Sequence, residues 1–357
     1  MGKEKIKILM HTEPNITSFN AQDLNGRYIA SLLDKDFFEI YFMDTLGTQI
    51  DPKLQKDNIK ILKIDTDNKI LRKIRAFKYK LLYRYDVSFY VRVFRIDSLF
   101  LKLLPFFDKN RKTIHMVESL VPYLGDKEYN KWAKYNALHS TKTFSISKKV
   151  QARVEEHYGI DTSIIHVGVD CSIFKPLQKN GKERLRVVGC GALNPMKQPL
   201  LFIKIAKKFP EADFVWVGEG ILRDEIVKKS DNIDNFELKN NMAHKELSEY
   251  FAQSDIFLFP SLHEGFPKVV IESMACRLPS IVFDRYGPEA VIDNQTGFIV
   301  SDENEMIDRL RILIKDKNIR EEFSNNSVKR AKEFDWKLIV KEWDKIIKDL
   351  VNENYRG

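Results

Sequence analysis

Short apolar runs alternate with longer amphipathic stretches along the chain. Residues 256–259 and 280–283 are continuous apolar runs, which predict strands buried on both faces. The stretch between them has helical spacing, because its apolar residues share one face of a helix: Val270, Ile271, Met274 and Leu278. Pro267 suits the first helical position, where its fixed φ fits and its missing N–H is not needed. The pattern predicts a strand-loop-helix-strand unit.

The same alternation extends over the rest of the chain. Further strands are expected at residues 6–10, 39–43, 86–90, 113–117, 143–147, 185–188, 214–217 and 236–238. Helices are expected around Ile29, Leu32 and Leu33, at 69–84, up to Tyr158, at 245–252, 305–315 and 319–333, and from Trp336 on. This order predicts an α/β protein with two Rossmann-like, doubly wound parallel-sheet domains facing a cleft, with ligands at the carboxyl ends of the strands.

Length and composition agree with two soluble domains. The chain has 357 residues, and its 43% apolar and 31% charged content excludes a disordered protein. No apolar run approaches the roughly 18 residues of a membrane-spanning helix. The charged N-terminus leads directly into a strand, so we expect no signal peptide.

Cysteine, histidine and net charge narrow the classes further. Three widely spaced cysteines predict reduced thiols in the cytosol, neither a disulfide framework nor a zinc site. Seven scattered histidines show no ligand spacing, and no metal site is expected. The net charge of +8 alone suits nucleic acid, a membrane surface or a small anionic substrate.

Two carboxylates bracket the start of the helix after residue 267. Glu264 lies in the loop, and Glu272 lies roughly opposite the Val270 stripe, so we expect it outside the core and within reach of a ligand at the helix start. Free amides at a helix start bind phosphate, and Gly265 lets the backbone come close. On the alternative interpretation, both glutamates only complement the helix dipole, which is worth about 0.3–1 kcal/mol each.

The whole string resembles family 4 glycosyltransferases, whose mark is Glu-x7-Glu. The matching residues are Glu264-Gly265-Phe266-Pro267, Glu272-Ser273-Met274-Ala275 and Pro279. The resemblance implies a GT-B fold and a retaining transfer of sugar. It also implies that Glu272 holds the ribose of a nucleotide-sugar, that Glu264 faces the sugar, and that amides of Phe266 and Lys268 approach the diphosphate. Arg277 stands where the family usually has glycine, so the turn after the helix is expected to differ.

Other segments of the second half fit the family in part. Gly191-Ala192-Leu193 lacks the family's arginine, while Lys197 falls in the position of its phosphate-binding lysine. Gly218 and Gly220 match a turn whose glycines let the backbone approach the nucleotide, and Leu238 is expected to border the base. If Lys197 lies on a solvated loop, its charge contributes almost nothing to catalysis. If it lies near a phosphate, it offsets the negative charge of the leaving group.

The resemblance also divides the chain. Residues 168–176 resemble the family's interdomain passage, and the polar run 178–184 reads as a linker. We therefore expect an acceptor-binding domain at residues 1–175 and a nucleotide-sugar domain at residues 176–334. The last helix, 335–357, is expected to pack back on the first domain, as in the family.

The first half departs from the family at two places. The loop after the first strand has Glu13-Pro14-Asn15 where the family often has Gly-Gly, which leaves the acceptor-side geometry open. Family members often carry a histidine near the reacting sugar at the end of the 113–117 strand; Glu118 takes that place here, and His115 lies two residues before the strand's end. A helix-capping Glu-Ser and an ordinary strand histidine explain these residues equally well.

Residues 69–84 predict a basic amphipathic helix. Ile70, Ile74, Phe77 and Leu81 align on one face, and the basic residues Lys69, Lys73, Lys80 and Arg84 flank them. Such helices lie on anionic membranes, and membrane-surface family 4 enzymes have similar ones, although a surface helix with its stripe turned inward has the same pattern.

These observations predict a metal-independent retaining hexosyltransferase of cell-surface glycan synthesis. Its expected partners are a nucleotide-sugar and a glycan or lipid-linked acceptor, with no nucleic acid and no further cofactor, in the cytoplasm or on the inner face of the membrane. We expect no Asp-x-Asp at a strand end, and metal-dependent transferases of the other common fold need such a pair. The alternatives are a nucleotide-sugar epimerase of the same build and a catalytically weak partner subunit, which Ala192 suggests. A nicotinamide dehydrogenase would need a full glycine fingerprint.

Overall fold

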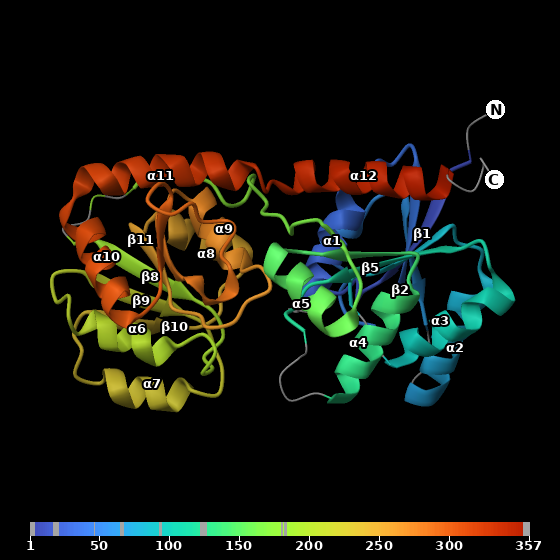
Figure 1. Ribbon diagram of the computed structural model, residues 1–357, viewed down its shortest axis with the longest axis horizontal. Helices are drawn as coiled ribbons and strands as arrows, with labels where there is room; N and C mark the ends of the chain where they lie inside the picture. The colour runs from blue at the N-terminus through green and yellow to red at the C-terminus, as the bar shows by residue number, and fades with distance from the viewer. Residues whose placement is uncertain are drawn as a thin grey trace. The chain divides into compact units, whose positions relative to one another are not determined.

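The computed structural model describes residues 4–16, 21–45, 47–64, 68–92, 95–121, 127–179, 181 and 184–352. The chain divides into two compact units, Met1–Val167 with Trp336–Gly357, and Gly168–Asp335 (Figure 1). The division precedes Gly168, whereas the sequence predicts it near residue 175. The N–H of Val169 donates to the carbonyl of Phe334 (2.9 Å), which ties the interdomain passage to the end of the second unit.

A parallel sheet forms the centre of the first unit. Within the described residues it has seven strands, in the order β3-β2-β1-β4-β5-β6-β7. They are β1 (Ile6–His11), β2 (Phe38–Asp44), β3 (Ile59–Lys63), β4 (Val87–Tyr90), β5 (Lys112–Val117), β6 (Lys142–Ser145) and β7 (Ser163–Ile164). Ile8 pairs with Ile40 on one side and Val87 on the other, and all three are buried, as the apolar runs predict. The strand order reverses between β1 and β4.

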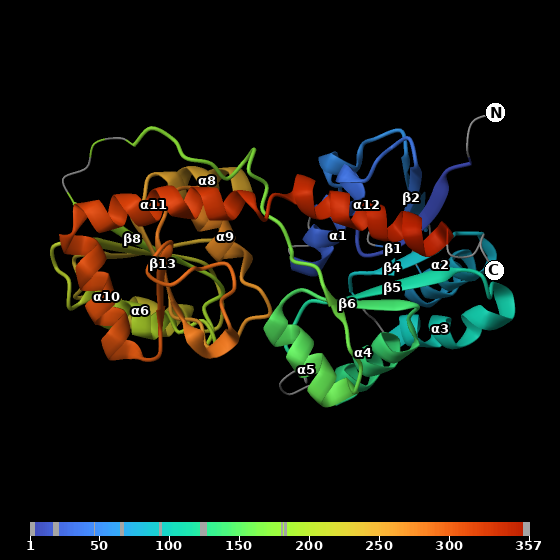
Figure 2. The same cartoon turned by 45° about the horizontal axis from the view of Figure 1, so that its top comes forward.

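Helices cover both faces of this sheet. They are α1 (Ala21–Leu32), η1 (Pro52–Leu54), α2 (Lys69–Leu82), α3 (Arg95–Phe107), α4 (Lys127–His139), α5 (Lys148–Tyr158) and α12 (Trp336–Asn352). Figure 2 shows α12 running beside α1. Trp343 of α12 is fully buried against Phe89 of β4 and Phe144 of β6, with ring centroids 4.7 and 5.0 Å apart. The apolar stripe of the last helix is therefore part of the core of the first unit.

The second unit repeats the plan with a six-stranded parallel sheet in the order β10-β9-β8-β11-β12-β13. Its strands are β8 (Arg186–Cys190), β9 (Asp213–Val217), β10 (Phe236–Lys239), β11 (Ile256–Phe259), β12 (Ser280–Phe283) and β13 (Gly297–Val300). Its helices are α6 (Pro199–Ala206), α7 (Arg223–Ser230), α8 (His244–Ala252), α9 (Lys268–Ala275), η2 (Asp284–Tyr286), α10 (Glu303–Lys315) and α11 (Lys317–Lys332). The strand order reverses between β8 and β11, and Trp216 and Phe202 are among the buried side chains of the core.

Several element boundaries differ from the prediction for local reasons. Pro267 is the N-cap of α9 and not its first residue. Strand β6 ends at Ser145 because Ser147 caps α5, accepting a hydrogen bond from the N–H of Val150. Strand β13, which the sequence analysis does not predict, begins at Gly297. Such small shifts leave the order of the predicted elements unchanged.

The turn after α9 has a backbone suited to glycine although Arg277 occupies it. Arg277 has φ of 73°, in the left-handed region. Its N–H donates to the carbonyl of Met274 (3.0 Å), and the N–H of Leu278 donates to that of Ser273 (3.1 Å), which is a Schellman arrangement. The replacement of glycine therefore leaves a glycine-type turn in place.

The apolar stripe predicted on residues 69–84 is divided between two environments. Phe77 and Leu81 pack inward against α3, whereas the side chain of Ile74 is 58% exposed. The side chains of Lys69, Ile70 and Lys73 lie outside the described residues. Phe77 and Leu81 thus fit the alternative of a stripe turned inward, and Ile74 fits a stripe that faces outward, because α2 packs against α3 as well as facing solvent.

Candidate active site

Lys197 and Glu264 meet where the strand order of the second sheet reverses. Lys197 lies in the loop after β8, and Glu264 lies in the loop after β11. Because β8 and β11 are neighbours, their carboxyl ends place both loops at one edge of the sheet. This switch point is where open α/β sheets bind ligands.

A close ion pair links the two loops. Lys197 Nζ contacts Glu264 Oε1, and the hydroxyl of Ser261 donates to the same oxygen (2.6 Å). Lys197 Nζ also lies 5.3 Å from the ring centroid of Phe259. Both charged side chains are mostly buried, yet each keeps some exposure, 23% for Lys197 and 11% for Glu264. A cation and a hydrogen-bond acceptor are thus held side by side, within reach of a ligand.

Glu272 is buried, which corrects the expectation that it lies outside the core. Its side chain on α9 is 6% exposed, and its charge acts on the thiols of Cys190 and Cys276. Burial raises the pKa of Glu272, while the charge of Lys268 lowers it. No described residue donates a hydrogen bond to its carboxylate, and its oxygens are not among the buried atoms that lack a partner, so they keep access to solvent. A solvent-accessible carboxylate without a protein donor is suited to receive hydrogen bonds from a ligand.

The start of α9 adds amides to the same edge. Pro267 precedes the helix with φ of −75°, and Phe266 is buried with its ring 5.4 Å from that of Phe334. The first N–H groups of a helix have no partner within it, and they favour an anion. Gly265 and Lys268 flank this start, as the sequence predicts.

Gly218 and Gly220 are required by the packing of two loops against each other. A Cβ on Gly218 would lie 2.0 Å from the carbonyl oxygen of Gly191, and one on Gly220 would lie 2.7 Å from that of Leu193. The N–H of Leu193 donates to the carbonyl of Glu219 (2.8 Å), which joins the loops. The sequence analysis expects these glycines to admit a nucleotide; the close loop packing is a reason that it did not anticipate.

Leu238 and Gly191 complete the predicted set in the second unit. The side chain of Leu238 is half-buried and packs against the apolar core. Gly191 has φ of +153°, and a Cβ there would meet the stem of Lys197 at 3.5 Å. The roles of both residues in donor binding stay predictions.

Glu118 and His115 lie in the first unit. Strand β5 ends at Val117 as expected, and Glu118, which follows it, is buried and accepts a hydrogen bond from the amide of Asn25 (2.7 Å). His115 is buried within the strand, and burial lowers its pKa to about 4. His115 is therefore neutral at pH 7. The catalytic roles of Glu118 and His115 near the reacting sugar stay predictions.

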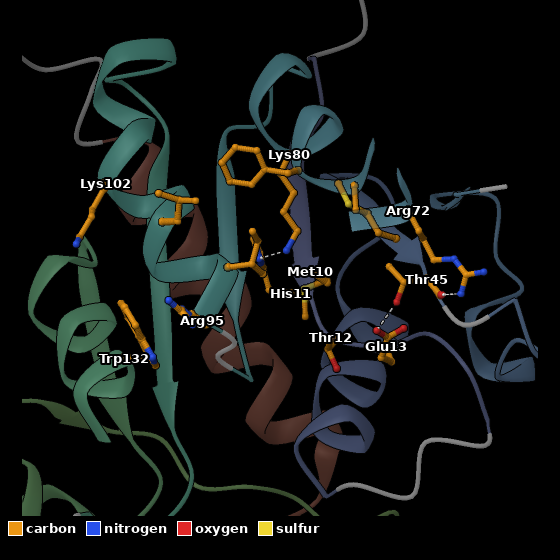
Figure 3. A pocket seen from close by; sticks show the side chains of 15 residues that line it. Met10, His11, Thr12, Glu13, Thr45, Arg72, Lys80, Arg95, Lys102 and Trp132 are labelled. Carbon is orange, nitrogen blue, oxygen red and sulfur yellow. Dashed lines mark hydrogen bonds between the residues drawn. The ribbon is translucent and has the colours of Figure 1, made fainter. Parts of the chain in front are cut away.

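The sequence analysis missed a buried polar cluster at the end of β1. His11 Nδ1 lies 3.0 Å from Asp97 Oδ1, and the ammonium of Lys80 donates to the same oxygen (2.9 Å). Figure 3 draws the contact of 3.2 Å between Lys80 Nζ and His11 Nδ1. Burial, and then the charge of Lys80, lowers the pKa of His11 to about 4. Although burial raises it, the pKa of Asp97 lies well below its usual range because Lys80 and His11 stabilise the carboxylate. Lys80, predicted on a membrane-facing flank, is thus tied inward.

One signal for this cluster was present in the sequence. His11 directly follows the predicted strand 6–10, and ligands of parallel sheets lie at such strand ends. The partner Asp97 comes from α3, which the sequence analysis did not predict.

The described part of the chain contains neither a metal-type cluster nor a helix that could span a membrane. In that part, no group of three or more His, Cys, Asp or Glu side chains is arranged to hold a metal ion. None of its helices combines the length and apolar character that crossing a bilayer requires.

The expectation that no Asp-x-Asp stands at a strand end needs correction. Strand β3, which was not predicted, ends at Lys63, and Asp65 and Asp67 follow it closely. This Asp-x-Asp lies outside the described residues.

Two doubly wound parallel α/β sheets are the plan of the GT-B fold, and similarity to solved structures confirms this fold. Sucrose-phosphate synthase from Thermosynechococcus elongatus matches with a TM-score of 0.83 at 16% identity, covering 97% of this chain and 99% of that one. Anabaena HepE, in complex with UDP and glucose, matches with a TM-score of 0.76 at 14% identity, covering 97% and 100%.

Residues 172–330 match the family Glycosyl transferases group 1, so the second unit is a group 1 glycosyl transferase domain and the resemblance is confirmed. A Campylobacter jejuni N-acetyl-D-galactosaminyltransferase, whose name gives a saccharide on PP-undecaprenol as acceptor, is 30% identical over 183 residues. That match covers 48% of this chain and 50% of the relative. The chain spans about half the length of the curated relatives it matches.

Proposed function

We propose that the chain is a retaining glycosyltransferase. It moves a sugar, of hexose type, from a nucleotide-sugar to a saccharide or lipid-linked acceptor in cell-surface glycan synthesis. The observation that carries the proposal is Glu272, a buried residue of α9 whose carboxylate receives no hydrogen bond from the described residues, in a group 1 glycosyl transferase domain. The ribose of a nucleotide offers hydroxyl donors that satisfy such a carboxylate.

The other groups at this sheet edge match the rest of a nucleotide-sugar. The first-turn amides of α9 and the ammonium of Lys197 stabilise the diphosphate, and Glu264 accepts hydrogen bonds from sugar hydroxyls. In the reaction, the bond from the anomeric carbon to the diphosphate oxygen breaks and leaves its electron pair on the diphosphate. The bond from the anomeric carbon to the acceptor oxygen forms, and the acceptor hydroxyl gives its proton to the departing diphosphate. Lys197 lowers the barrier because it offsets the charge that develops on the leaving group.

We propose that this reaction needs no divalent metal. The support is that Lys197 and a helix start supply positive charge where the diphosphate would lie. Turnover that a chelator abolishes and manganese restores would contradict this part. In that event, replacing Asp65 and Asp67 with asparagine tests whether they hold the metal. Glu118 and His115 stay predictions for the acceptor side.

The acceptor is proposed to lie at an anionic membrane surface, where the protein binds peripherally from the cytoplasm. The supporting surface is the outer face of α2 and α3, which exposes Ile74, Leu99, Phe106 and Phe107, with exposed fractions of 58%, 46%, 84% and 56%. Exposed basic residues such as Arg75 and Lys78 accompany them. Apolar side chains among cations are the features of a membrane-surface helix. A relative acts on a lipid-linked saccharide, which agrees with this location.

The experiment is a turnover assay with a panel of nucleotide-sugars and polyprenyl-diphosphate-linked saccharides in chelator. Retained anomeric configuration in a new glycoside is expected, and the Glu264→Gln variant should be at least about 100-fold slower because it loses a contact to the reacting sugar. Conversion of the donor sugar to its epimer without transfer would instead favour the epimerase. A chain active only with a second subunit would favour the partner-subunit alternative.

A further inference from the structure

The first unit contains a cavity of about 830 Å³ at the carboxyl ends of β1 and β2. Side chains from β1, α2, α3 and α4 line it (Figure 3). Its volume lies in the range of about 300–1,000 Å³ that is typical of small-molecule sites. It also lies at the end of β1, beside the reversal of strand order between β1 and β4, where α/β sheets bind ligands.

Positive charge dominates the polar lining. Four cations line the cavity, Arg72, Lys80, Arg95 and Lys102, and Glu13 is the carboxylate among the described lining residues. Buried Asp97 offsets the charge of Lys80. Arg95 and Lys102 form no ion pair with a carboxylate of the described residues; they lie over the rings of Trp132 (5.4 Å) and Tyr135 (4.8 Å), respectively. These two cations of α3 therefore favour an anion.

The opposite end of the cavity suits a sugar hydroxyl. Figure 3 shows Arg95, Lys102 and Trp132 on one side of His11, with Glu13 and Thr45 on the other. Thr45 donates to Glu13 Oε1 (2.7 Å), whereas Glu13 Oε2 is buried and has no hydrogen-bond partner among the described residues. A buried oxygen without a donor is satisfied by a ligand hydroxyl.

The apolar lining continues onto the protein surface. Ile96 and Leu99 line the cavity, and they are also 37% and 46% exposed. The same helix, α3, exposes Phe106 and Phe107 near its end. A chain of carbon atoms that leaves the cavity across Ile96 and Leu99 therefore meets an apolar face and not a polar one.

We propose that this cavity binds the diphosphate and first sugar of a polyprenyl-linked acceptor, with the diphosphate at Arg95 and Lys102. A sugar hydroxyl donates to Glu13, and the polyprenyl chain leaves across Ile96 and Leu99 toward the bilayer. The inference rests on the proposed function and adds to it the chemical class of the acceptor and the residues that bind it.

The test uses calorimetric titration of the full chain with three probes: farnesyl diphosphate, farnesol and inorganic diphosphate. Farnesyl diphosphate should bind, and each of the other two probes should bind at least about tenfold more weakly. Farnesol lacks the diphosphate that Arg95 and Lys102 bind, and inorganic diphosphate lacks the isoprenoid chain. The double variant Arg95→Gln/Lys102→Gln should weaken farnesyl diphosphate binding by about tenfold or more, as expected for lost charge-assisted hydrogen bonds. The matched control, Lys109→Gln/Lys149→Gln, removes two exposed charges outside the cavity lining and should change binding by less than about twofold.

Three results would overturn the inference. If inorganic diphosphate bound as tightly as farnesyl diphosphate, the cavity would be a site for free anions. Equal weakening in both double variants would mean attraction by net charge alone. Absence of farnesyl diphosphate binding, in protein that still binds a nucleoside diphosphate, would reject the cavity and leave the proposed function standing; loss of both would count against both.

Discussion

Lys197 forms an ion pair with Glu264, 67 residues further along the chain, across the loops that follow β8 and β11. Neither loop alone contains both a lysine and a carboxylate. The parallel neighbours β8 and β11 bring them together at the reversal of strand order. The pair explains how one short segment of each strand-loop unit contributes to a single site.

Replacing Lys197 with methionine should lower kcat by about 100-fold or more, because charge on the leaving diphosphate loses its stabilisation, as with the removal of one oxyanion donor. Single-turnover kinetics with saturating donor measure the effect. Lys204→Met is the matched control, since Lys204 is exposed on α6 and pairs with Glu303. Equal rates for wild type and Lys197→Met would remove Lys197 from the chemistry.

Replacing Glu272 with glutamine should stabilise the ligand-free protein at pH 7. Burial raises the pKa of Glu272, so ionisation in the folded state is unfavourable, and this group lowers stability as pH rises above the ordinary carboxyl pKa. The amide removes that effect. Thermal unfolding of wild type and variant at pH 7 and pH 4.5 measures it, and the gain should be larger at pH 7. A variant less stable at both values would refute a strained carboxylate.

Replacing Arg277 with glycine should stabilise the protein by about 1 kcal/mol or slightly less, since a non-glycine residue in the left-handed region costs about 1–2 kcal/mol. The loss of the exposed hydrogen bond from Arg277 Nε to Asn325 (3.1 Å), and the greater freedom of glycine in the unfolded chain, offset part of the gain. Denaturant unfolding measures the change. A loss of stability would mean that the contact with Asn325 outweighs the strain.

Acidification should destabilise the first unit below about pH 6.5. Burial lowers the pKa of His115 to about 4, so the unfolded chain binds a proton between about pH 6.5 and 4 that the folded chain does not. Each such histidine removes about 1.4 kcal/mol per pH unit in this window. His11 behaves in the same way, held neutral by burial and the charge of Lys80. The loss between pH 6.5 and 5 should be smaller in a His115→Gln variant; an unchanged pH slope would contradict this.

Binding to anionic vesicles should depend on the end of α3. Replacing Phe106 and Phe107 with serine should release the protein, since burying a phenylalanine contributes about 1.5–3 kcal/mol. Vesicle sedimentation at low salt measures it, and salt should also release the wild type. Ile221→Ser, at an equally exposed position in the second unit, is the control. If the wild-type protein did not bind anionic vesicles at low salt, the membrane proposal would be wrong.

The parts of the fold that sequence could predict are those with strong local patterns. Continuous apolar runs such as residues 256–259 identify central strands, and Glu264 and Glu272 share one motif around one helix. Strand β3 was missed because its apolar residues alternate with Lys60 and Lys63 at a sheet edge. Local pattern places Glu272 opposite the apolar stripe, but only the packing of α9 reveals that it is buried.

The parts that could not be predicted depend on contacts between distant segments. The His11, Lys80 and Asp97 cluster joins β1, α2 and α3, and its formation follows from strand order, which no single segment contains. Position 218 likewise requires glycine because the carbonyl of Gly191, in another loop, leaves no room for a Cβ. A resemblance to a family supplies roles for motif residues, but not for clusters particular to this chain.

The most direct test of the central claim is nucleotide-sugar binding to wild type and Glu272→Gln, each compared with its own ligand-free melting curve. A nucleotide-sugar at 100 times its dissociation constant should stabilise the wild type by about 2.7 kcal/mol. The Glu272→Gln variant should bind more weakly by about 1.5–3 kcal/mol because it loses charge-assisted hydrogen bonds to the ribose. If no nucleotide-sugar stabilises the wild type, or if one stabilises both proteins equally, the assignment of this sheet edge as the donor site is wrong.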